Sequence, residues 1–296
     1  MKGGISAFRT IEPGDENQPV NLSSFNSSGS HVALCNSGSQ VKLHDRDGVF
    51  VLETPKGYSY MSDLSNTSGH VSLITGIEFH RFEDNIFATS SIDGSIRVWD
   101  TDNSLTKHHS IYKIKNKQGK RVKAHCVGYS FDCKLLTAGL ANGTIPLWDL
   151  KKSTYAPPVM EIKDQQFENV EIQSISFSSD GSKLVSRSFN GDCRLYDLRM
   201  NGKQMFCLTN LSTKYSSQNV QFSPDGSYII TTLSESPKSK ACLNFYDSKS
   251  GNCIRNIHFS SKTPINCQWH LGLNQIFVSC SDGSLTGLFG LNSLDK

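Results

Sequence analysis

The same strand–turn–strand phrase recurs six times along the chain, and this repetition constrains the fold more than any other feature of the sequence. Its clearest copy is NIFATSSIDGSIRVWD (85–100), in which two stretches of alternating apolar and polar residues flank an Asp-Gly pair. The phrases follow one another at intervals of 55, 49, 48, 50 and 43 residues, and they end at Asp45, Asp100, Asp149, Asp197, Asp247 and Gly290. A self-similar period of this size indicates a repeat architecture, in which each copy is one supersecondary unit.

Each phrase is preceded by a further strand, and most copies are followed by another. ITGIEFH (74–80) and IQSISFS (172–178) are preceding strands, and VFVLET (49–54) is a following one. Four short antiparallel strands in each unit are typical of a WD40 β-propeller, whose blades cover one another's faces. The chain therefore resembles an all-β WD40 propeller, a single domain over 1–296 with six recognisable four-stranded blades. The predicted blades cover 18–55, 70–115, 122–163, 170–209, 216–259 and 263–290.

The sixth unit supplies only three strands, whereas the segment ISAFRTI (5–11) is a strand pattern without a unit of its own. An unpaired strand edge exposes a row of backbone donors and acceptors, which invites association with other chains. We expect residues 5–11 to pair with this edge, complete the last blade and close the ring.

The resemblance to WD40 proteins implies a structural role for four polar and aromatic residues of the second blade. In that family a His, a Ser or Thr, an Asp and a Trp form a hydrogen-bonded line, and the matching residues here are His70, Ser91, Asp93 and Trp99. Asp93 and Gly94 form the expected tight turn, in which glycine adopts a positive φ. In the third and fourth units Asn142 and Asn190 stand where Asp93 does, so we expect those blades to be stabilised by packing alone.

Three longer phrases, 44–70, 112–122 and 269–278, resemble the WD repeat-containing protein seventy (gastrulation-defective-like) family. That family has seven blades, and the first three strands of its first blade have no counterpart here. Either the chain is a six-bladed form or it is a fragment with a gap, and both readings stay open. The resemblance implies a nuclear adaptor or substrate receptor of a cullin-4 ubiquitin ligase, acting in chromatin ubiquitination and DNA double-strand-break repair. It also implies chromatin or repair factors as partners, and a monomer within a larger complex.

Composition and motifs argue against several other classes of protein. The nine cysteines include no Cys-x-x-Cys pair, which argues against a disulfide framework or a zinc site and favours a reduced, intracellular protein. No segment has the apolar length of a signal peptide or a membrane span. Dinucleotide-binding, phosphate-loop, metalloprotease and nucleophile-elbow motifs are absent, so we expect no catalytic residues, metal or cofactor.

The strongest local charge lies between residues 107 and 123, where seven cations fall within 17 residues although the whole chain carries only +3. Alternation of Lys113, Lys115 and Lys117 predicts one basic face of an outer strand, and Lys120, Arg121 and Lys123 extend it. These six residues are a candidate patch for phosphates of RNA or DNA, or for an acidic partner. A solvated edge strand protected by lysines is the simpler alternative. Only Tyr112 is near enough in sequence to stack on a base, so we expect no sequence-specific readout.

A second candidate site is the end of the fourth phrase, Tyr196-Asp197-Leu198-Arg199. WD40 receptors of the cullin-4 ligase often end a blade in Trp/Tyr-Asp-x-Arg, with the arginine directed toward the ligase's propeller adaptor subunit. The resemblance therefore implies that Tyr196, Asp197 and Arg199 contact this adaptor. A surface arginine paired with Asp197 is the alternative that needs no partner.

From these observations we expect a non-enzymatic protein-interaction scaffold in the nucleus, acting as an adaptor or substrate receptor of a cullin-4 ligase. The alternative is an RNA-associated scaffold of the spliceosome or another ribonucleoprotein, held through residues 107–123.

Overall fold

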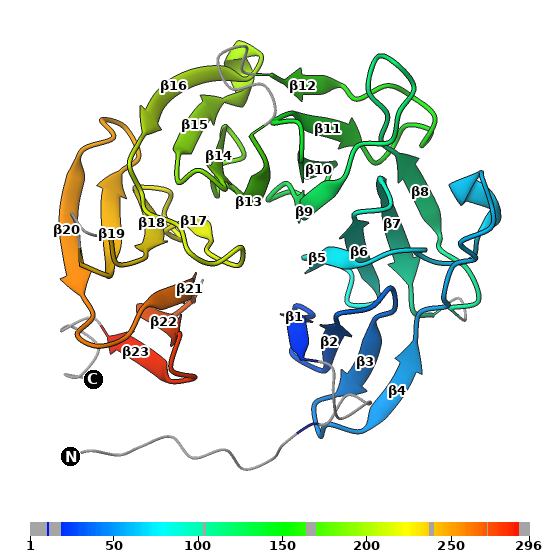
Figure 1. Ribbon diagram of the computed structural model, residues 1–296, viewed down its shortest axis with the longest axis horizontal. Coiled ribbons are helices and arrows are strands. Elements are labelled where there is room, and N and C mark those ends of the chain that lie inside the picture. Colours follow the sequence, from blue (N-terminus) through cyan, green and yellow to red (C-terminus); the bar gives the residue numbers. More distant parts are fainter. Residues whose placement is uncertain are drawn as a thin grey trace. The chain divides into compact units, whose positions relative to one another are not determined.

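The computed structural model describes residues 11, 19–102, 105–163, 170–236, 240–270 and 272–289 (Figure 1). The chain divides into two compact units, residues 1–124 and 125–296. Within the described ranges the regular structure is β-strand, apart from two single 3₁₀ turns, η1 (Leu64–Asn66) and η3 (Leu198–Met200). No helix in those ranges is both long and apolar enough to cross a membrane.

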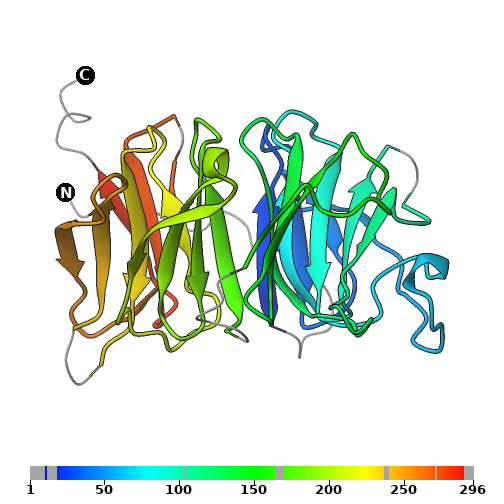
Figure 2. The ribbon, with the colours of Figure 1, turned by 90° about the horizontal axis from the view of Figure 1, so that it is seen from above.

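The first unit contains two four-stranded sheets, each a simple meander in which sequence neighbours pair antiparallel. The strands of the first sheet are β1 (Val20–Phe25), β2 (His31–Asn36), β3 (Lys42–Asp45) and β4 (Phe50–Glu53). Those of the second sheet are β5 (Ile74–Phe79), β6 (Ile86–Ser91), β7 (Ser95–Asp100) and β8 (Ser110–Lys113). A long connector, residues 54–73, joins β4 to β5, and Figure 2 shows part of it standing away from the two sheets.

The second unit repeats the same meander in four sheets (Figure 1). Its first sheet consists of β9 (Ala124–Tyr129), β10 (Leu135–Leu140), β11 (Ile145–Asp149) and β12 (Met160–Ile162). The second consists of β13 (Ile172–Phe177), β14 (Lys183–Ser188), β15 (Cys193–Asp197) and β16 (Lys203–Leu208). The third consists of β17 (Val220–Phe222), β18 (Tyr228–Leu233), β19 (Cys242–Asp247) and β20 (Cys253–His258). The fourth has three strands within the described residues, β21 (Pro264–Trp269), β22 (Gln275–Cys280) and β23 (Leu285–Phe289).

A register shift recurs at the same place in four sheets, near the start of the first strand where it pairs with the second. The shifts lie between Val20 and Leu22, Ile74 and Gly76, Ile172 and Ser174, and Pro264 and Asn266. A bulge of this kind bends the strand and increases its twist. Its recurrence shows that the sequence repeat is also a repeat of backbone geometry.

Apolar side chains from facing sheets form the core of each unit. In the first unit Cys35 and Leu43 of the first sheet pack with Ile74, Phe87 and Trp99 of the second. In the second unit three such clusters join successive sheets, the first to the second, the second to the third and the third to the fourth. Each large side chain buried in this way contributes about 1.5–3 kcal/mol, so the blades depend on their neighbours for stability.

The fold class expected from the sequence is confirmed, because the chain is all-β and is built from antiparallel sheets of the propeller-blade type. Gly94 has φ +81°, as the Asp-Gly turn requires. The expected closing strand, 5–11, lies outside the described residues except for Ile11, so ring closure stays a prediction. A single domain over 1–296 likewise stays a prediction.

Candidate functional site

The polar line of the second blade runs through Thr89 and not through Ser91. Trp99 Nε1 donates to Thr89 Oγ1 at 2.8 Å, and the same hydroxyl lies 2.7 Å from His70 Nε2. His70 Nδ1 is 3.0 Å from Asp93 Oδ2. The indole can only donate and the carboxylate can only accept, which sets the direction of the whole line. Trp99 donates to Thr89, Thr89 donates to His70, and His70 donates to Asp93.

The geometry of the β6–β7 pair explains why Ser91 cannot take this role. Trp99 lies directly opposite Phe87, so Thr89 is its diagonal neighbour on the same face. Ser91 stands two residues, roughly 7 Å, farther along β6. Its hydroxyl donates instead to the carbonyl of Ser72 and accepts from the amide of Asp93. Ser91 therefore shapes the turn, and its expected place in the line is corrected to Thr89.

Burial fixes the protonation states along this line. Burial alone would raise the pKa of the Asp93 carboxyl, but hydrogen bonds from His70 and Ser95 outweigh it and hold the pKa at about 2. Burial lowers the pKa of His70. The pair is therefore a neutral imidazole donating to a carboxylate, with the remaining oxygen of Asp93 held by Ser95 at 2.6 Å. The polar atoms of all four side chains in the line are occupied by hydrogen bonds that hold the blade together. The role of the line is therefore structural.

The blades that carry asparagine at this turn are not stabilised by packing alone, as the sequence had suggested. Asn142 Oδ1 accepts from the hydroxyl of Thr144 at 2.8 Å. Asn190 Nδ2 donates to Asp192 at 3.0 Å, and Arg194 forms an ion pair with the same carboxylate at 3.3 Å. Each turn thus has its own polar network, and that expectation was wrong.

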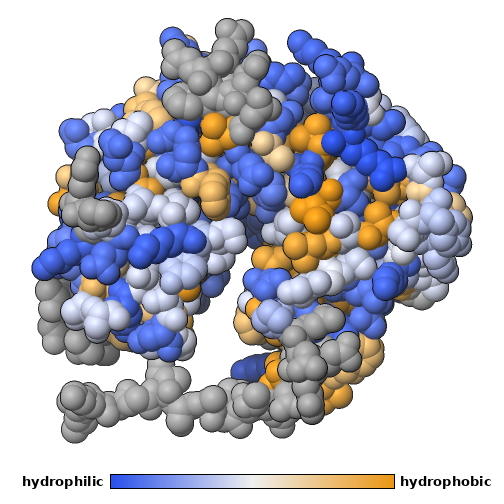
Figure 3. All heavy atoms as spheres, in the orientation of Figure 1, coloured by the Kyte–Doolittle hydropathy of each residue, from blue (hydrophilic) through white to orange (hydrophobic). Residues whose placement is uncertain are grey.

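The basic segment begins on the outer strand β8 and continues as a hairpin, so only part of it is the outer strand predicted from its alternation. Strand β8 ends at Lys113, and the amide of Val122 donates to the carbonyl of Ile114 at 3.1 Å. Asn116 closes the turn, because its side-chain oxygen accepts from the amide of Lys120 at 2.9 Å. Of the three alternating lysines only Lys113 therefore lies on the outer strand, and Lys115 and Lys117 belong to the hairpin. Figure 3 shows hydrophilic side chains gathered where this hairpin, residues 114–122, follows β8.

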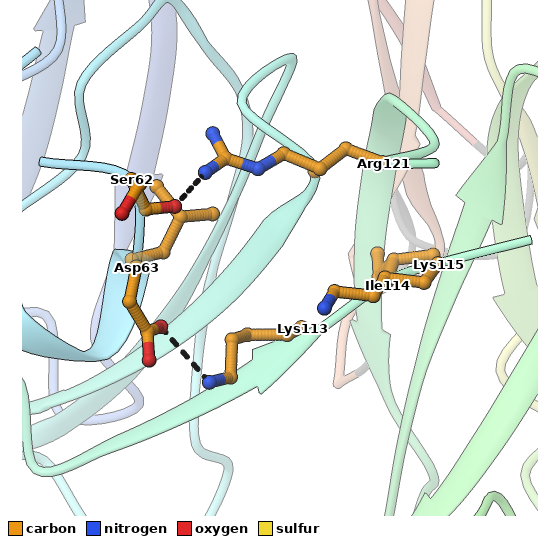
Figure 4. A pocket seen from close by; sticks show the side chains of 8 residues that line it. Ser62, Asp63, Lys113, Ile114, Lys115 and Arg121 are labelled. Carbon is orange, nitrogen blue, oxygen red and sulfur yellow. Dashed lines mark hydrogen bonds and ion pairs between the residues drawn. The ribbon is translucent and has the colours of Figure 1, made fainter. Parts of the chain in front are cut away.

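Two of the six predicted patch residues tie the hairpin region to the connector (Figure 4). Lys113 Nζ lies 3.0 Å from Asp63 Oδ1, and it also donates to the hydroxyl of Ser65 at 2.6 Å. Arg121 donates to the backbone carbonyl of Ser62. Hydrogen bonds from the backbone and side chain of Ser65 and from Lys113 hold the pKa of Asp63 well below its usual range. Between connector and hairpin lies a cleft of about 240 Å³ that also exposes Lys115.

A buried arginine holds the other side of the connector. Arg97, on β7, donates to the carbonyl of Leu64 at 2.9 Å and to the hydroxyl of Thr67 at 2.7 Å. Burial lowers its pKa to about 10, so it stays charged at neutral pH. Nδ1 of His108 lies beside the Arg97 guanidinium and also 3.2 Å from the carbonyl of Ser68. Burial and the charge of Arg97 lower the pKa of His108 to about 4.

The remaining patch residues, Lys115, Lys117, Lys120 and Lys123, are exposed on or beside the hairpin. Tyr112 is buried, which contradicts its expected availability for stacking on a base. Sequence reasoning missed two exposed aromatic residues in the connector, Tyr58 and Tyr60, which lie 49 and 47 residues before Lys107, where the basic segment begins. Their proximity to it could be seen only through the bonds of Ser62 and Asp63 to the hairpin region.

The second candidate site lies at the end of β15. The carboxylate of Asp197 accepts from the backbone amide of Arg199 at 2.9 Å and so begins η3. The Arg199 guanidinium is 3.3 Å from the same carboxylate and is 70% exposed. Tyr196 is buried in the core with Leu184, so its predicted contact with a partner is corrected to a packing role. Asp197 is also largely buried, and Arg199 is the accessible member of the three.

A polar cleft lies beside this arginine. The amide of Leu198 donates to the carbonyl of Ser182 at 2.8 Å, which holds η3 against the β13–β14 turn. That turn forms one wall of a cleft of about 540 Å³, whose other walls carry Lys134 and Lys151. Among the described residues there is no cluster of three or more His, Cys, Asp or Glu side chains arranged to hold a metal.

Comparison with known proteins finds matches to a repeat family and to longer relatives. The model of the WD domain, G-beta repeat, matches residues 62–100 and 161–197. The gastrulation defective protein 1 homolog of Drosophila melanogaster is 33% identical over 287 residues, and human WD repeat-containing protein 70 is 34% identical over 284 residues. An uncharacterized WD repeat-containing protein of Schizosaccharomyces pombe is 27% identical over 309 residues.

These alignments cover nearly all of this chain but only part of each relative. The alignments with the fly and human proteins cover 96% of the chain and 43% of the relative. The yeast alignment covers 98% of the chain and 53% of the relative. The chain thus spans about half the length of the relatives it matches, or less. The chain carries repeats that match the WD domain, G-beta repeat, and along almost its whole length it is similar to WD repeat-containing protein 70.

Proposed function

We propose that this WD40-repeat scaffold is an adaptor or substrate receptor of a cullin-4 ubiquitin ligase, and that Arg199 contacts the ligase's adaptor subunit. WD40-repeat proteins are in general non-enzymatic and bind other proteins. The observation that carries the finer proposal is the exposure of Arg199 together with its attachment to the buried Asp197. An arginine held at its base offers a planar fork of donors in a fixed direction, which lysine cannot imitate.

The surroundings of Arg199 support an interface at this end of β15. The neighbouring cleft carries both signs of charge, with Lys134 and Lys151 beside Asp149 and Asp180. Arginines at the centre of an interface are frequent hot spots, because they combine packing with several hydrogen bonds. In this proposal the rim around Arg199 binds the ligase, and loops elsewhere hold a substrate.

The nuclear location, the role in chromatin ubiquitination and DNA double-strand-break repair, and the chromatin or repair partners belong to the same proposal. Their support is the resemblance of 44–70, 112–122 and 269–278 to the WD repeat-containing protein 70 family.

A second candidate function is an RNA-associated scaffold of the spliceosome or another ribonucleoprotein. One observation favours it: Lys115, Lys117 and Lys120 project from a hairpin on which every charged residue is basic. Such side chains displace the counterions of nucleic-acid phosphates when they bind. The affinity therefore falls steeply as the salt concentration rises.

A capture experiment from nuclear extract tests both functions. The unmodified chain is compared with Arg199→Ala, with the matched exposed-arginine control Arg255→Ala, and with a Lys115/Lys117/Lys120/Arg121→Ala variant. The ligase proposal predicts that the adaptor and cullin are captured by the unmodified chain and by Arg255→Ala, and are lost with Arg199→Ala. If ligase subunits are never captured, and ribonucleoproteins are lost only from the basic variant, the proposal is wrong and the second function stands.

A further inference from the structure

We propose that the connector and the basic hairpin together form a binding surface for single-stranded RNA, in which Tyr58 and Tyr60 stack on bases and Lys115, Lys117 and Lys120 contact phosphates. This inference is independent of the ligase proposal. It rests on the RNA-associated function given above and adds to it the class of RNA and the residues that read it.

The two tyrosines form an exposed aromatic pair. Their ring centroids are 5.6 Å apart with an interplanar angle of 40°, and the side chains are 51% and 79% exposed. A turn holds them in place, because the amide of Met61 donates to the carbonyl of Tyr58 at 3.2 Å. Exposed aromatic rings of this kind are the stacking platforms on which proteins hold unpaired bases.

The hairpin is attached next to this pair. Arg121 donates to the carbonyl of Ser62, only two residues after Tyr60. Two extended residues span about 7 Å, so the Tyr60 backbone lies within about that distance of the Arg121 contact. Lys115 opens onto the same cleft, as Figure 4 shows. The backbone next to the aromatic pair is therefore attached to the basic hairpin, although 55 residues of sequence separate Tyr60 from Lys115.

Contacts on both sides of the connector hold it in place before any ligand binds. Leu64 of η1 is buried, and Arg97 fixes its carbonyl and the hydroxyl of Thr67 from beneath. On the outer side Lys113 holds Asp63, which also begins η1 by accepting from the amide of Ser65. A segment anchored on both sides loses little conformational entropy when a ligand binds, which favours affinity.

The chemistry of the surface selects single-stranded RNA over an acidic peptide or a duplex. No acidic residue occurs between 103 and 131, and Asp63, the one acid that lines the cleft, already faces Lys113. Clustered cations suit any polyanion, whereas an exposed aromatic pair adds a contact that carboxylates cannot use. In a duplex the bases stack on each other and are not available to tyrosine.

Fluorescence anisotropy with a labelled ten-nucleotide oligouridine RNA tests the inference on the full chain. We expect Tyr58→Ala/Tyr60→Ala to weaken binding about 10- to 100-fold, because each stacked base contributes substantially. Tyr58→Phe/Tyr60→Phe should bind as the unmodified chain does. The matched control is Tyr155→Ala, which removes a tyrosine that is also 79% exposed but lies in the second unit. Lys115/Lys117/Lys120→Ala should reduce the slope of log K against log salt by about 2.

The outcomes separate this inference from the broader RNA-associated function. Binding that depends on the lysines but is unchanged in Tyr58→Ala/Tyr60→Ala overturns the inference and leaves the broader function standing. Equal affinity for a duplex of the same length also overturns it, as does equal competition by a polyglutamate peptide. Absence of binding to oligouridine at low salt overturns both. Circular dichroism of each variant shows that the sheets have formed.

Discussion

Thr89 Oγ1 accepts the indole N–H of Trp99 at 2.8 Å, and through this one hydroxyl the tryptophan of β7 is joined to His70 on the connector. The threonine is buried, so neither nitrogen has water as an alternative partner. Loss of the hydroxyl would leave two buried polar groups without their hydrogen bonds, which costs far more than the bond itself contributes.

Thr89→Val should therefore lower the free energy of unfolding by about 2–4 kcal/mol, because valine fills the same space but satisfies neither His70 nor Trp99. Ser91→Ala is the matched control, and it should cost only about 1 kcal/mol. Urea unfolding followed by tryptophan fluorescence measures both values. If Ser91→Ala lowers the free energy of unfolding as much as Thr89→Val or more, Ser91 and not Thr89 is the hydroxyl residue of the polar line.

Stability should fall as the pH drops below about 6.5, because His70 and His108 both have lowered pKa values in the folded chain. The unfolded chain binds protons at these residues near their model value of 6.5 while the folded chain does not, so acid favours unfolding. Each histidine contributes a slope of up to about 1.4 kcal/mol per pH unit.

The stability that His108 contributes is lost between pH 6.5 and about 4. The stability that Asp93 contributes is lost as the pH falls further, toward about 2. Urea unfolding between pH 7.5 and 4.5 measures the slope. His108→Gln should show a shallower dependence than the unmodified chain over this range. Identical slopes would mean that His108 binds protons equally in the folded and the unfolded chain, which contradicts a lowered pKa.

Arg97→Met should release the connector, since it removes the donors to Leu64 and Thr67 and leaves their oxygens buried. We expect a loss of about 2–4 kcal/mol in the free energy of unfolding and faster tryptic cleavage after the exposed Lys56. Limited proteolysis with mass spectrometry follows this cleavage. The exposed Arg46→Met variant is the control, and comparable cleavage rates in the two would show that Arg97 does not hold the connector.

Gly191→Ala should be more destabilising than Gly181→Ala, although both glycines have a positive φ, +86° and +67°. A Cβ on Gly191 would lie 1.8 Å from the carbonyl oxygen of Leu211, whereas nothing lies within 4 Å of one on Gly181. The left-handed backbone costs each variant about 1–2 kcal/mol, and the clash adds to this only at Gly191. Thermal unfolding compares the two. Equal melting temperatures would contradict the close approach of Leu211.

The sequence predicted the blades well because their signals are local. Strand alternation, turn residues and the repeat interval are all read within about 50 residues, and each observed sheet falls inside the range expected for its blade. The choice between Thr89 and Ser91 could not be made in this way. Both are small hydroxyl residues on the same face of one strand, and only the register against Trp99 distinguishes them.

Which residues make up each candidate site depends on burial and on contacts between distant parts of the chain, and the sequence alone does not show these. Tyr112 lies within the basic segment but is buried, whereas Tyr58 and Tyr60 are distant in sequence and exposed on a connector whose Ser62 carbonyl accepts from Arg121. Tyr196 and Asp197 lie on β15, whose residues are all buried, so of the predicted Tyr-Asp-x-Arg contact Arg199 alone reaches the surface. Motif matching assigns residue types, and burial then decides which of them a partner can reach.

Direct binding between the purified chain and the purified adaptor subunit of the cullin-4 ligase tests the central proposal most directly. Isothermal titration calorimetry compares the unmodified chain with Arg199→Ala, Arg199→Lys and the exposed control Arg255→Ala. The proposal predicts equal binding by the unmodified chain and Arg255→Ala, and at least a tenfold loss in both Arg199 variants, because lysine lacks the planar fork. Failure of the unmodified chain to bind, or unchanged binding by Arg199→Ala, would contradict it.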